Sequence, residues 1–363
     1  MPPNGFPYST RPLRFAGAAL CVVLAVAGCT KSEDSNTPPP AAGTGGAQAT
    51  QAPAGNDSTC TLSQYGGSQI DLKSAVVGFS QSEKEANPFR IAETQSIKDE
   101  AAKAGVKQLL TTNANSQLSK QISDIQDMIN QGAQVLIVAP LNSDGLEPAL
   151  SAARAKNIPV LTIDRKVNAT ACKDYVAFLG SNFVEQGKRA AQQMAKALSN
   201  KGKVAILLGS SGNNVTTDRT SGFVDELKAT APGIQVVAQQ TGDFARDKGQ
   251  QVMEQLIQAT PDINGVYAEN DEMALGALVA LTSAGKKPGT DVQVVSVDGT
   301  RNAVTKVTDG QMYSVVESNP RFGPLSFSTL QTFFAGQPVA QNVVISDKLY
   351  TKDNATAEVA NAY

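Results

Sequence analysis

The amino-acid sequence predicts an α/β protein of two lobes, each built around a doubly wound parallel sheet. Short apolar stretches of strand length alternate with stretches of helix length, which is typical of a parallel sheet flanked by helices. The alternation restarts near residue 203, and in each half it leads to a strand that ends in aspartate, Asp164 in the first half and Asp298 in the second. A chain of 363 residues is long enough for two domains of ordinary size.

The elements of the two halves can be assigned in order from hydrophobic spacing and helix stop signals. In the first half we expect strands over residues 74–80, 106–111, 135–139 and 159–163, and helices over 91–104, 119–131 and 149–155. Gly105 and Gly132 stand where the first two helices should end. In the second half we expect strands over 203–208, 234–238, 265–268 and 292–297, and helices over 220–230, 247–259 and 272–284.

The N-terminus is typical of a targeting segment rather than of a folded domain. Arg11 and Arg14 precede an apolar run, which ends in Val26-Ala27-Gly28-Cys29 and resembles the lipobox of bacterial lipoproteins. We expect residues 1–29 to be a signal peptide, with lipid on Cys29 anchoring the exported protein to the outer face of the cell membrane. The alternative is a short transmembrane helix, for which the apolar run is too short.

A polar stretch follows the signal segment. Residues 30–57 consist mostly of Pro, Gly, Ala, Thr, Gln and Ser without a large apolar side chain, and such a composition cannot bury enough surface to fold. We therefore expect a disordered tether over residues 30–70.

The cysteines suggest one disulfide. Cys21 lies in the signal segment and Cys29 carries the lipid, so Cys60 and Cys172 remain in an exported chain. A disulfide between them is the natural pairing in a non-reducing compartment. The alternative is two unrelated buried thiols, because only geometry decides the pairing.

The composition excludes several classes of protein. The sequence contains no histidine, which removes the commonest general base and the commonest metal ligand. A net charge of −2 gives no indication of a nucleic-acid partner. We expect no metal and no cofactor.

Polar and aromatic residues gather just past the predicted strands, where doubly wound sheets bind their ligands. Amide, carboxylate and guanidinium groups can pair with the vicinal hydroxyls of a sugar, and an aromatic face can cover its ring C–H groups. Taken singly, an aspartate could cap a helix, an arginine could form a surface ion pair, and a phenylalanine could belong to the core. The residues concerned are Asn87, Phe89, Arg90, Asp164, Arg165, Arg219, Phe244, Asn270 and Asp298.

Several motifs in the sequence carry a resemblance to a known family. They are Asn87-Pro-Phe, Ile163-Asp-Arg, Asp218-Arg-Thr-Ser-Gly-Phe, Gly242-Asp-Phe-Ala-Arg-Asp-Lys-Gly, Glu269-Asn-Asp-Glu-Met-Ala-Leu-Gly-Ala and Val297-Asp-Gly-Thr. With them, residues 75–349 resemble the type I periplasmic binding proteins for pentoses and hexoses, of the ribose-binding kind. The resemblance implies that Asn87, Phe89, Asp164, Arg165, Arg219, Phe244, Asn270 and Asp298 face a neutral monosaccharide.

The same resemblance implies the domain organisation and the partner. The chain should cross between the lobes at a hinge of three segments, near Ser181, Ser318 and Ile345. One lobe should comprise residues 71–181 plus 318–345, and the other 182–317 plus 346–363. The protein, expected to be a monomer, should deliver its sugar to the permease of an ABC transporter.

Some positions depart from the ribose-binding pattern. Arg90 stands where ribose binders have a second aromatic residue, Ala139 where they have Asn, and Glu317 where they have Gln at the second crossover. Arg90 and Glu317 are similar to what galactofuranose-binding members show, so both join the expected ligand-binding set. The departures favour a larger aldose or a furanose over ribose.

Three other functions are alternatives to a transport receptor. A glycosidase could use Asp164 and Asp298 as its carboxylate pair, although the neighbouring Arg165 and Gly299 suit hydrogen bonding better than a raised pKa. A transcriptional repressor would need an N-terminal helix-turn-helix where the lipobox stands. A sugar-sensing co-receptor of a membrane signalling protein remains open, because the same closed form could dock either partner.

Overall fold

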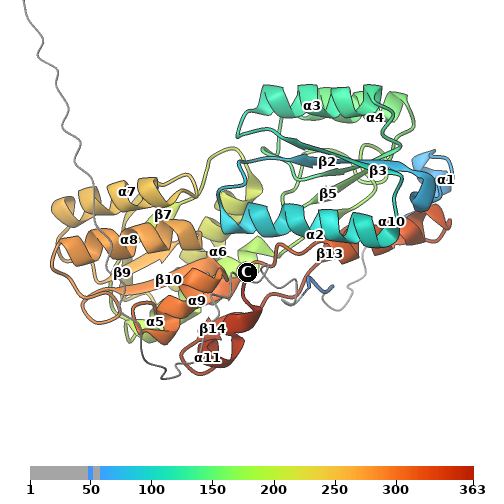
Figure 1. Cartoon of the computed structure of the whole chain (residues 1–363). Helices are drawn as coiled ribbons and strands as arrows, with labels where there is room; N and C mark the ends of the chain where they lie inside the picture. The colour runs from blue at the N-terminus through green and yellow to red at the C-terminus, as the bar shows by residue number, and fades with distance from the viewer. Residues whose placement is uncertain (1–47, 52–57) are drawn as a thin grey trace, which may run out of the picture. The chain divides into compact units, whose positions relative to one another are not determined.

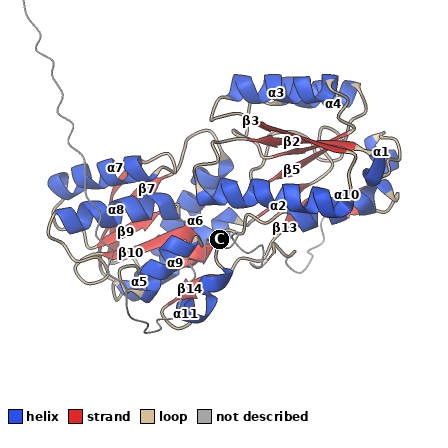
Figure 2. Ribbon diagram, viewed as in Figure 1, coloured by secondary structure: helices blue, strands red, loops and turns tan. Residues whose placement is uncertain are grey.

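Two six-stranded sheets organise the computed structural model, which describes residues 48–51 and 58–363 (Figures 1 and 2). The signal segment, Cys29 and most of the polar tether lie outside the described residues. Among the described helices, none combines the length and the apolar character that a bilayer span requires.

The first sheet has the strand order β13-β6-β5-β4-β2-β3, and all of its pairs are parallel. Its strands are β2 (Val76–Gln81), β3 (Gln108–Asn113), β4 (Val135–Val138), β5 (Val160–Ile163), β6 (Phe178–Gly180) and β13 (Asn342–Val344). Helices α3 (Leu118–Asn130) and α4 (Glu147–Ala155) cover one face, and α2 (Pro88–Ala104) and α10 (Gly323–Phe334) cover the other (Figure 1). Strand β4 shows why an unbroken apolar run suits a strand in the middle of this sheet. Val135 and Ile137 join the core under α2 and α10, whereas Leu136 and Val138 join the core under α3 and α4.

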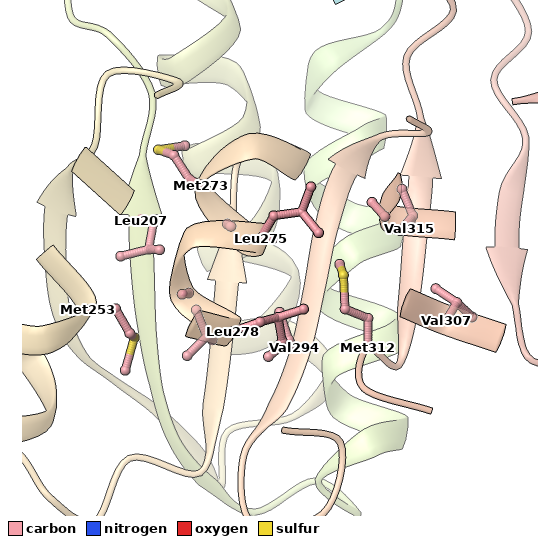
Figure 3. Packing of buried hydrophobic residues seen from close by; sticks show 14 of the residues in the cluster. Leu207, Met253, Met273, Leu275, Leu278, Val294, Val307, Met312 and Val315 are labelled. Carbon is pink, nitrogen blue, oxygen red and sulfur yellow. The ribbon is translucent and has the colours of Figure 1, made fainter. Parts of the chain in front are cut away.

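The second sheet has the order β14-β11-β10-β9-β7-β8 and is parallel except for β14, which runs antiparallel to β11. Its strands are β7 (Gly202–Leu208), β8 (Ile234–Thr241), β9 (Gly265–Ala268), β10 (Gln293–Asp298), β11 (Ser314–Glu317) and β14 (Leu349–Thr351). Helices α7 (Arg246–Ala259), α8 (Asp271–Ser283) and α9 (Arg301–Thr308) contribute to the core on one face. There Met253, Leu278 and Val307 gather around strand residues such as Leu207 and Val294 (Figure 3). Helices α5 (Phe183–Ala197) and α6 (Asn214–Thr230) pack on the other face.

The chain passes between the two sheets three times. The first crossover follows β6 at residues 181–182, the second joins β11 to α10 through residues 318–322, and the third joins β13 to β14 through residues 345–348. Two parallel-sheet lobes flanked by helices and linked by three crossovers form an α/β fold, as the sequence predicts.

The prediction of disorder as far as residue 70 was wrong for residues 58–70. Strand β1 (Thr59–Cys60) pairs antiparallel with β12 (Val339–Ala340), and Thr61 caps the short helix α1 (Leu62–Tyr65). A disulfide joins Cys60 to Cys172, with Cα atoms 5.2 Å apart. The order of this segment comes from partners far away in the sequence, which its polar composition does not reveal.

Candidate ligand-binding site

Residues from both lobes line one polar cavity. The cavity lies beyond the carboxyl ends of the parallel strands, where doubly wound sheets place their ligands. Every residue of the predicted ligand-binding set except Glu317 lines it, together with two residues that were not predicted. The lining residues are Glu83, Asn87, Phe89, Arg90, Asp164, Arg165, Val215, Arg219, Phe244, Asn270 and Asp298.

Three of the lining residues have an unusual backbone conformation. Asp164, Phe244 and Asp298 have φ values of 64°, 58° and 134°, in the region that favours glycine. Side chains are held there only when the surrounding structure demands it, and such positions concentrate at functional sites. Asp164 and Asp298 occupy matching places at the ends of β5 and β10 in the two lobes.

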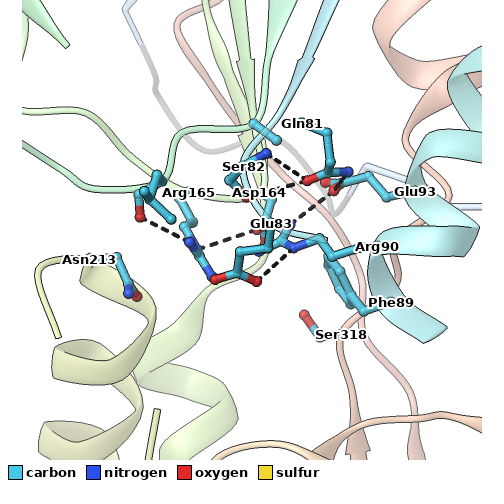
Figure 4. Close-up of polar contacts among 12 residues, drawn as sticks. Gln81, Ser82, Glu83, Phe89, Arg90, Glu93, Asp164, Arg165, Asn213 and Ser318 are labelled. Carbon is cyan, nitrogen blue, oxygen red and sulfur yellow. Dashed lines mark hydrogen bonds and ion pairs between the residues drawn. The ribbon is translucent and has the colours of Figure 1, made fainter. Parts of the chain in front are cut away.

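Arg90 is the centre of a buried ionic network in the first lobe (Figure 4). One of its terminal nitrogens lies 2.9 Å from Glu93 Oε2 and 2.7 Å from Asp164 Oδ2, and its Nε lies 3.2 Å from Glu83 Oε2. Burial raises the pKa of Glu93 to about 7, because its carboxylate has no exposed surface and Arg90 offsets only part of the desolvation. The network holds the guanidinium group of Arg90 in place at the wall of the cavity.

Glu83 connects Arg90 to Arg165 and was not among the predicted site residues. Its other carboxylate oxygen lies 2.7 Å from a terminal nitrogen of Arg165. Burial alone would raise the pKa of Glu83, but the two guanidinium groups outweigh burial and lower it to about 2. The signal that could have found Glu83 is its position two residues after the end of β2, where the rule that ligands bind at strand ends also applies.

Arg165 keeps one donor free of hydrogen bonds. Its terminal nitrogens donate to Glu83 and, over 2.9 Å, to the carbonyl oxygen of Leu141, and its guanidinium carbon lies 5.8 Å from the centre of the Phe244 ring. Its buried Nε lies 3.7 Å from Asp164 Oδ2 but has no hydrogen-bond partner among the described residues. A buried N–H group without a partner is costly, so it marks a position where a ligand oxygen could bind.

Arg219, on α6, is the arginine that the second lobe contributes to the cavity lining. Its Nε donates to Gln186 over 2.9 Å, and a terminal nitrogen donates to the carbonyl oxygen of Glu269 over 2.6 Å. Its other terminal nitrogen lies 3.6 Å from Asp298. Two of the nitrogens are thus committed to the protein, and the third lies beside a carboxylate of the cavity.

Asp271 supports the loop that carries Asp298. It accepts hydrogen bonds from the backbone of Gly299 and Thr300, at 2.9 and 2.7 Å, and from the hydroxyl of Ser296. Burial raises the pKa of Asp271 to about 6 and that of Asp298 well above its ordinary value. Asp298 therefore has the character of a strongly desolvated carboxyl group with Arg219 as its counterion.

Asn87 and Asn270 cap helices and also line the cavity. Asn87 accepts from the amide of Phe89 over 2.9 Å at the start of α2, and Asn270 accepts from the amide of Met273 over 3.0 Å at the start of α8. The side-chain nitrogen of Asn270 donates to the carbonyl oxygen of Phe244 over 3.1 Å. Capping fixes the orientation of both amides at the wall of the cavity.

Glu317 lies outside the cavity lining, so the structure does not place it with the other predicted residues. Its two oxygens accept from the amide of Lys348 over 2.9 Å and from the hydroxyl of Tyr350 over 2.8 Å. Lys348 directly precedes β14 and Tyr350 lies within it, so the carboxylate of Glu317 anchors an edge strand. In the described part of the chain, no cluster of acidic residues and cysteines could hold a metal ion.

Two doubly wound lobes with a polar cavity at their strand ends define a two-lobed binding receptor. Comparison with protein families agrees, because the model described as "Periplasmic binding protein domain" matches residues 77–337. This chain belongs to that family. Membership confirms the expectation of a binding protein rather than an enzyme.

The chain is similar to characterised sugar receptors over most of its length. It is 37% identical over 267 residues to the ribose import binding protein RbsB of Bacillus subtilis, covering 73% of this chain and 84% of the relative. It is 32% identical to the galactofuranose-binding protein YtfQ of Escherichia coli, covering 78% of this chain and 90% of the relative. A crystal structure from Mycobacterium smegmatis in complex with β-D-fucofuranose aligns with a TM-score of 0.75 and 37% identity, covering 78% of this chain and 93% of that chain.

Proposed function

We propose that this protein captures a neutral monosaccharide in the cavity between its lobes and delivers it to the permease of an ABC transporter. The observation that carries the proposal is that each guanidinium group in the cavity lining lies beside a carboxyl group of the same lining. The lining contains three guanidinium groups and three carboxyl groups, contributed by Arg90, Arg165, Arg219, Glu83, Asp164 and Asp298. A cavity with this balance suits a neutral polyol, whereas an anionic sugar would need surplus positive charge.

The kinds of groups at the cavity also favour a sugar. Guanidinium and carboxylate groups can pair with adjacent hydroxyls, and the orphaned Nε of Arg165 lacks an acceptor that a hydroxyl oxygen would supply. The rings of Phe89 and Phe244 line the same cavity and offer apolar faces. Sites of this type hold a small ligand with a few well-placed polar groups on an apolar background.

Lobe closure is the mechanism by which the transporter would detect the ligand. A sugar that contacts both lobes gains all of its interactions only when the lobes come together, so its binding shifts the population toward the closed form. The permease can then respond to closure rather than to the sugar itself. The protein is proposed to act as a monomer and to need no cofactor.

Among sugars, we favour a hexose in a galactofuranose-like form over ribose. The long guanidinium group of Arg90 can donate to the hydroxyls of a two-carbon exocyclic side chain, which a hexofuranose has. Ribose offers a single exocyclic hydroxyl as a furanose and none as a pyranose. A buried donor left without an acceptor costs about 1–3 kcal/mol, so a pocket arranged for those hydroxyls would disfavour ribose. The galactofuranose-binding and fucofuranose-bound relatives support this preference.

Titration calorimetry on the purified protein tests ligand class and preference. A thermal-shift screen of pentoses, hexoses, galactofuranose and inositols comes first, because a ligand at a hundredfold excess over its dissociation constant stabilises by about 3 kcal/mol. Asp298→Ala should abolish binding of the selected sugar, and Arg90→Phe should weaken the preference for the hexofuranose. Arg154→Phe is the matched control, because Arg154 is an exposed ion-pair residue of the same lobe. Ribose binding more tightly than any hexose would refute the preference, and the absence of sugar binding would refute the proposed function.

The lipid anchor is the other part of the proposal, and it concerns the location of the protein. If Cys29 carries lipid, Cys29→Ala should move the protein from the membrane fraction to the supernatant. Cys21→Ala is the matched control and should leave the protein on the membrane. Unchanged membrane association of the Cys29→Ala protein would refute the anchor.

A further inference from the structure

Residues 48–51, here called the strap, lie against the crossover segments between the two lobes. The amide of Ala49 donates to the carbonyl oxygen of Arg321 in the second crossover over 3.3 Å, and the amide of Ser346 in the third crossover donates to the carbonyl oxygen of Thr50 over 2.8 Å. Gln51 forms an antiparallel bridge with Ile345. The strap thus pairs with the third crossover through one bridge and also reaches the second.

The strap is anchored by a side chain as well as by its backbone. Ala49 is only 5% exposed and belongs to the hydrophobic core of the first lobe, whereas Gln48 and Thr50 on either side are exposed. A methyl group inserted between two solvated neighbours indicates specific docking. The family match begins at residue 77, so the strap is a feature of this chain outside the matched domain.

The residue of the third crossover that donates a hydrogen bond to the strap lies between residues that contact other parts of the hinge. Ile345 donates to the carbonyl oxygen of Gly180 at the end of β6, and the following Ser346 donates to the strap. Asp347 accepts from Ser181 in the first crossover over 3.1 Å and from Gln186 on α5 over 2.8 Å. Consecutive residues of one crossover therefore contact the first lobe, the strap and the segment entering the second lobe.

The lobes are in direct contact across the cleft in this arrangement. The amide of Ser143 donates to the carbonyl oxygen of Gly212 over 2.9 Å, and the amide of Lys166 donates to the side chain of Asn214 over 2.9 Å. Ser143 and Lys166 follow strands of the first sheet, and Gly212 and Asn214 follow a strand of the second. The strap is therefore docked on the crossovers while the lobes are closed.

We propose that the strap is a conformational device that stabilises closure of the lobes. A hinge motion is absorbed by dihedral changes in a few connecting residues. Backbone pairing that fits the crossovers in the closed arrangement holds those dihedrals and shifts the equilibrium toward closure. The strap follows the segment that should carry the lipid anchor. Undocking of the strap would therefore lower the affinity of the site for its ligand. The effect on affinity, but not on closure itself, rests on the proposed sugar-binding function.

The test compares Ala49→Asp with Gln48→Asp, each made in the full chain. Both variants add one carboxylate at neighbouring positions, but only the first places it in a buried site. Ala49→Asp should accelerate hydrogen exchange at the Ser346 amide and increase the radius of gyration of the ligand-free protein in X-ray scattering. It should also weaken sugar binding by about three- to tenfold, the range expected for the loss of one or two net hydrogen bonds. Gln48→Asp should match the unmodified protein in all three measurements.

Each outcome either supports or overturns the proposed role of the strap. Equal exchange at Ser346 in the two variants would show that the strap is not docked and would overturn the proposal. Faster exchange with an unchanged radius of gyration would show docking without influence on closure, which also overturns it. A variant with residues 48–51 deleted repeats the comparison and should behave as Ala49→Asp does. If the unmodified protein binds no sugar, the proposed function fails, while exchange and scattering still decide the role of the strap.

Discussion

Replacing Arg90 with methionine should destabilise the protein mainly through Glu93. Arg90 contacts three carboxylates, but two of them keep a cation nearby, since Arg165 lies 2.7 Å from Glu83 and 3.7 Å from Asp164. Glu93 has a fully buried side chain and keeps only the amide of Gln81, at 2.9 Å. Removing one partner of a buried ion pair costs about 3–5 kcal/mol, because the other charge stays buried without compensation.

A double-mutant cycle with Glu93→Gln measures that contribution. The glutamine removes the charge that Arg90 neutralises, so the double variant should recover at least about 1.5 kcal/mol of the loss. The free energy of unfolding is obtained from urea titrations followed by circular dichroism, since the chain has no tryptophan. Without Arg90 the pKa of Glu93 rises further, so the single variant should be less destabilised at pH 5 than at pH 8.

The same helix provides the control. Lys103 and Glu100 on α2 have the same three-residue spacing and are 3.2 Å apart, but the lysine side chain is 75% exposed. Lys103→Met should change the free energy of unfolding by no more than about 0.5 kcal/mol. The reasoning is refuted if Arg90→Met costs no more than this control, or if its coupling to Glu93→Gln is below about 0.5 kcal/mol.

Other predictions concern pH, the disulfide and helix packing. Burial raises the pKa of Glu269 to about 7 from an ordinary 4.5, so the folded state retains a proton that the unfolded state releases between these values. The free energy of unfolding should therefore fall as pH rises through this window, and Glu269→Gln should reduce the fall by about 3 kcal/mol in urea titrations; parallel curves would contradict this. Cys172→Ser should cost about 3–5 kcal/mol, since the bond to Cys60 closes a loop with a separation of 112 residues. Dithiothreitol should destabilise the unmodified protein by a similar amount and leave the serine variant unchanged, and two alkylatable thiols in the native protein would rule out the bond. Gly222→Ala should lower thermal stability by about 2 kcal/mol, because its methyl group would lie 2.1 Å from the carbonyl oxygen of Val184 and push α5 from α6; an unchanged melting temperature would contradict this contact.

The sheets were predicted from local features of the sequence, namely apolar runs and helix-ending glycines, which have the same roles in the structure. The apolar runs at β4 and β5 predict buried strands because each apolar side chain of such a run packs into a core on one face or the other. Gly105 ends α2 with a φ of 69°, as its position predicts. The short edge strands β13 and β14 gave no such signal, because three residues carry little periodicity and their pairing partners are remote.

Most of the candidate site was predictable for a topological reason. Parallel strands bring their carboxyl ends to one edge of a sheet, so polar residues that follow different strands must gather there. The approximate positions of Asp164 and Asp298 follow from the chain alone. That Glu317 lies outside the cavity lining does not follow from the chain alone. It depends on the edge strand that brings Tyr350 and the Lys348 amide to its carboxylate.

The sequence by itself determined the alternation of strands and helices, the repeated lobe and the kinds of side chains at the strand ends, because these depend on local composition and spacing. Only the tertiary structure decided that Glu83 bridges two arginines, that residues 58–70 are ordered, and that the strap lies on the crossovers. Each of these features joins residues that the spacing of apolar side chains along helices and strands does not bring together. Their energy comes from hydrogen bonds and ion pairs that form only after the chain has brought the partners together.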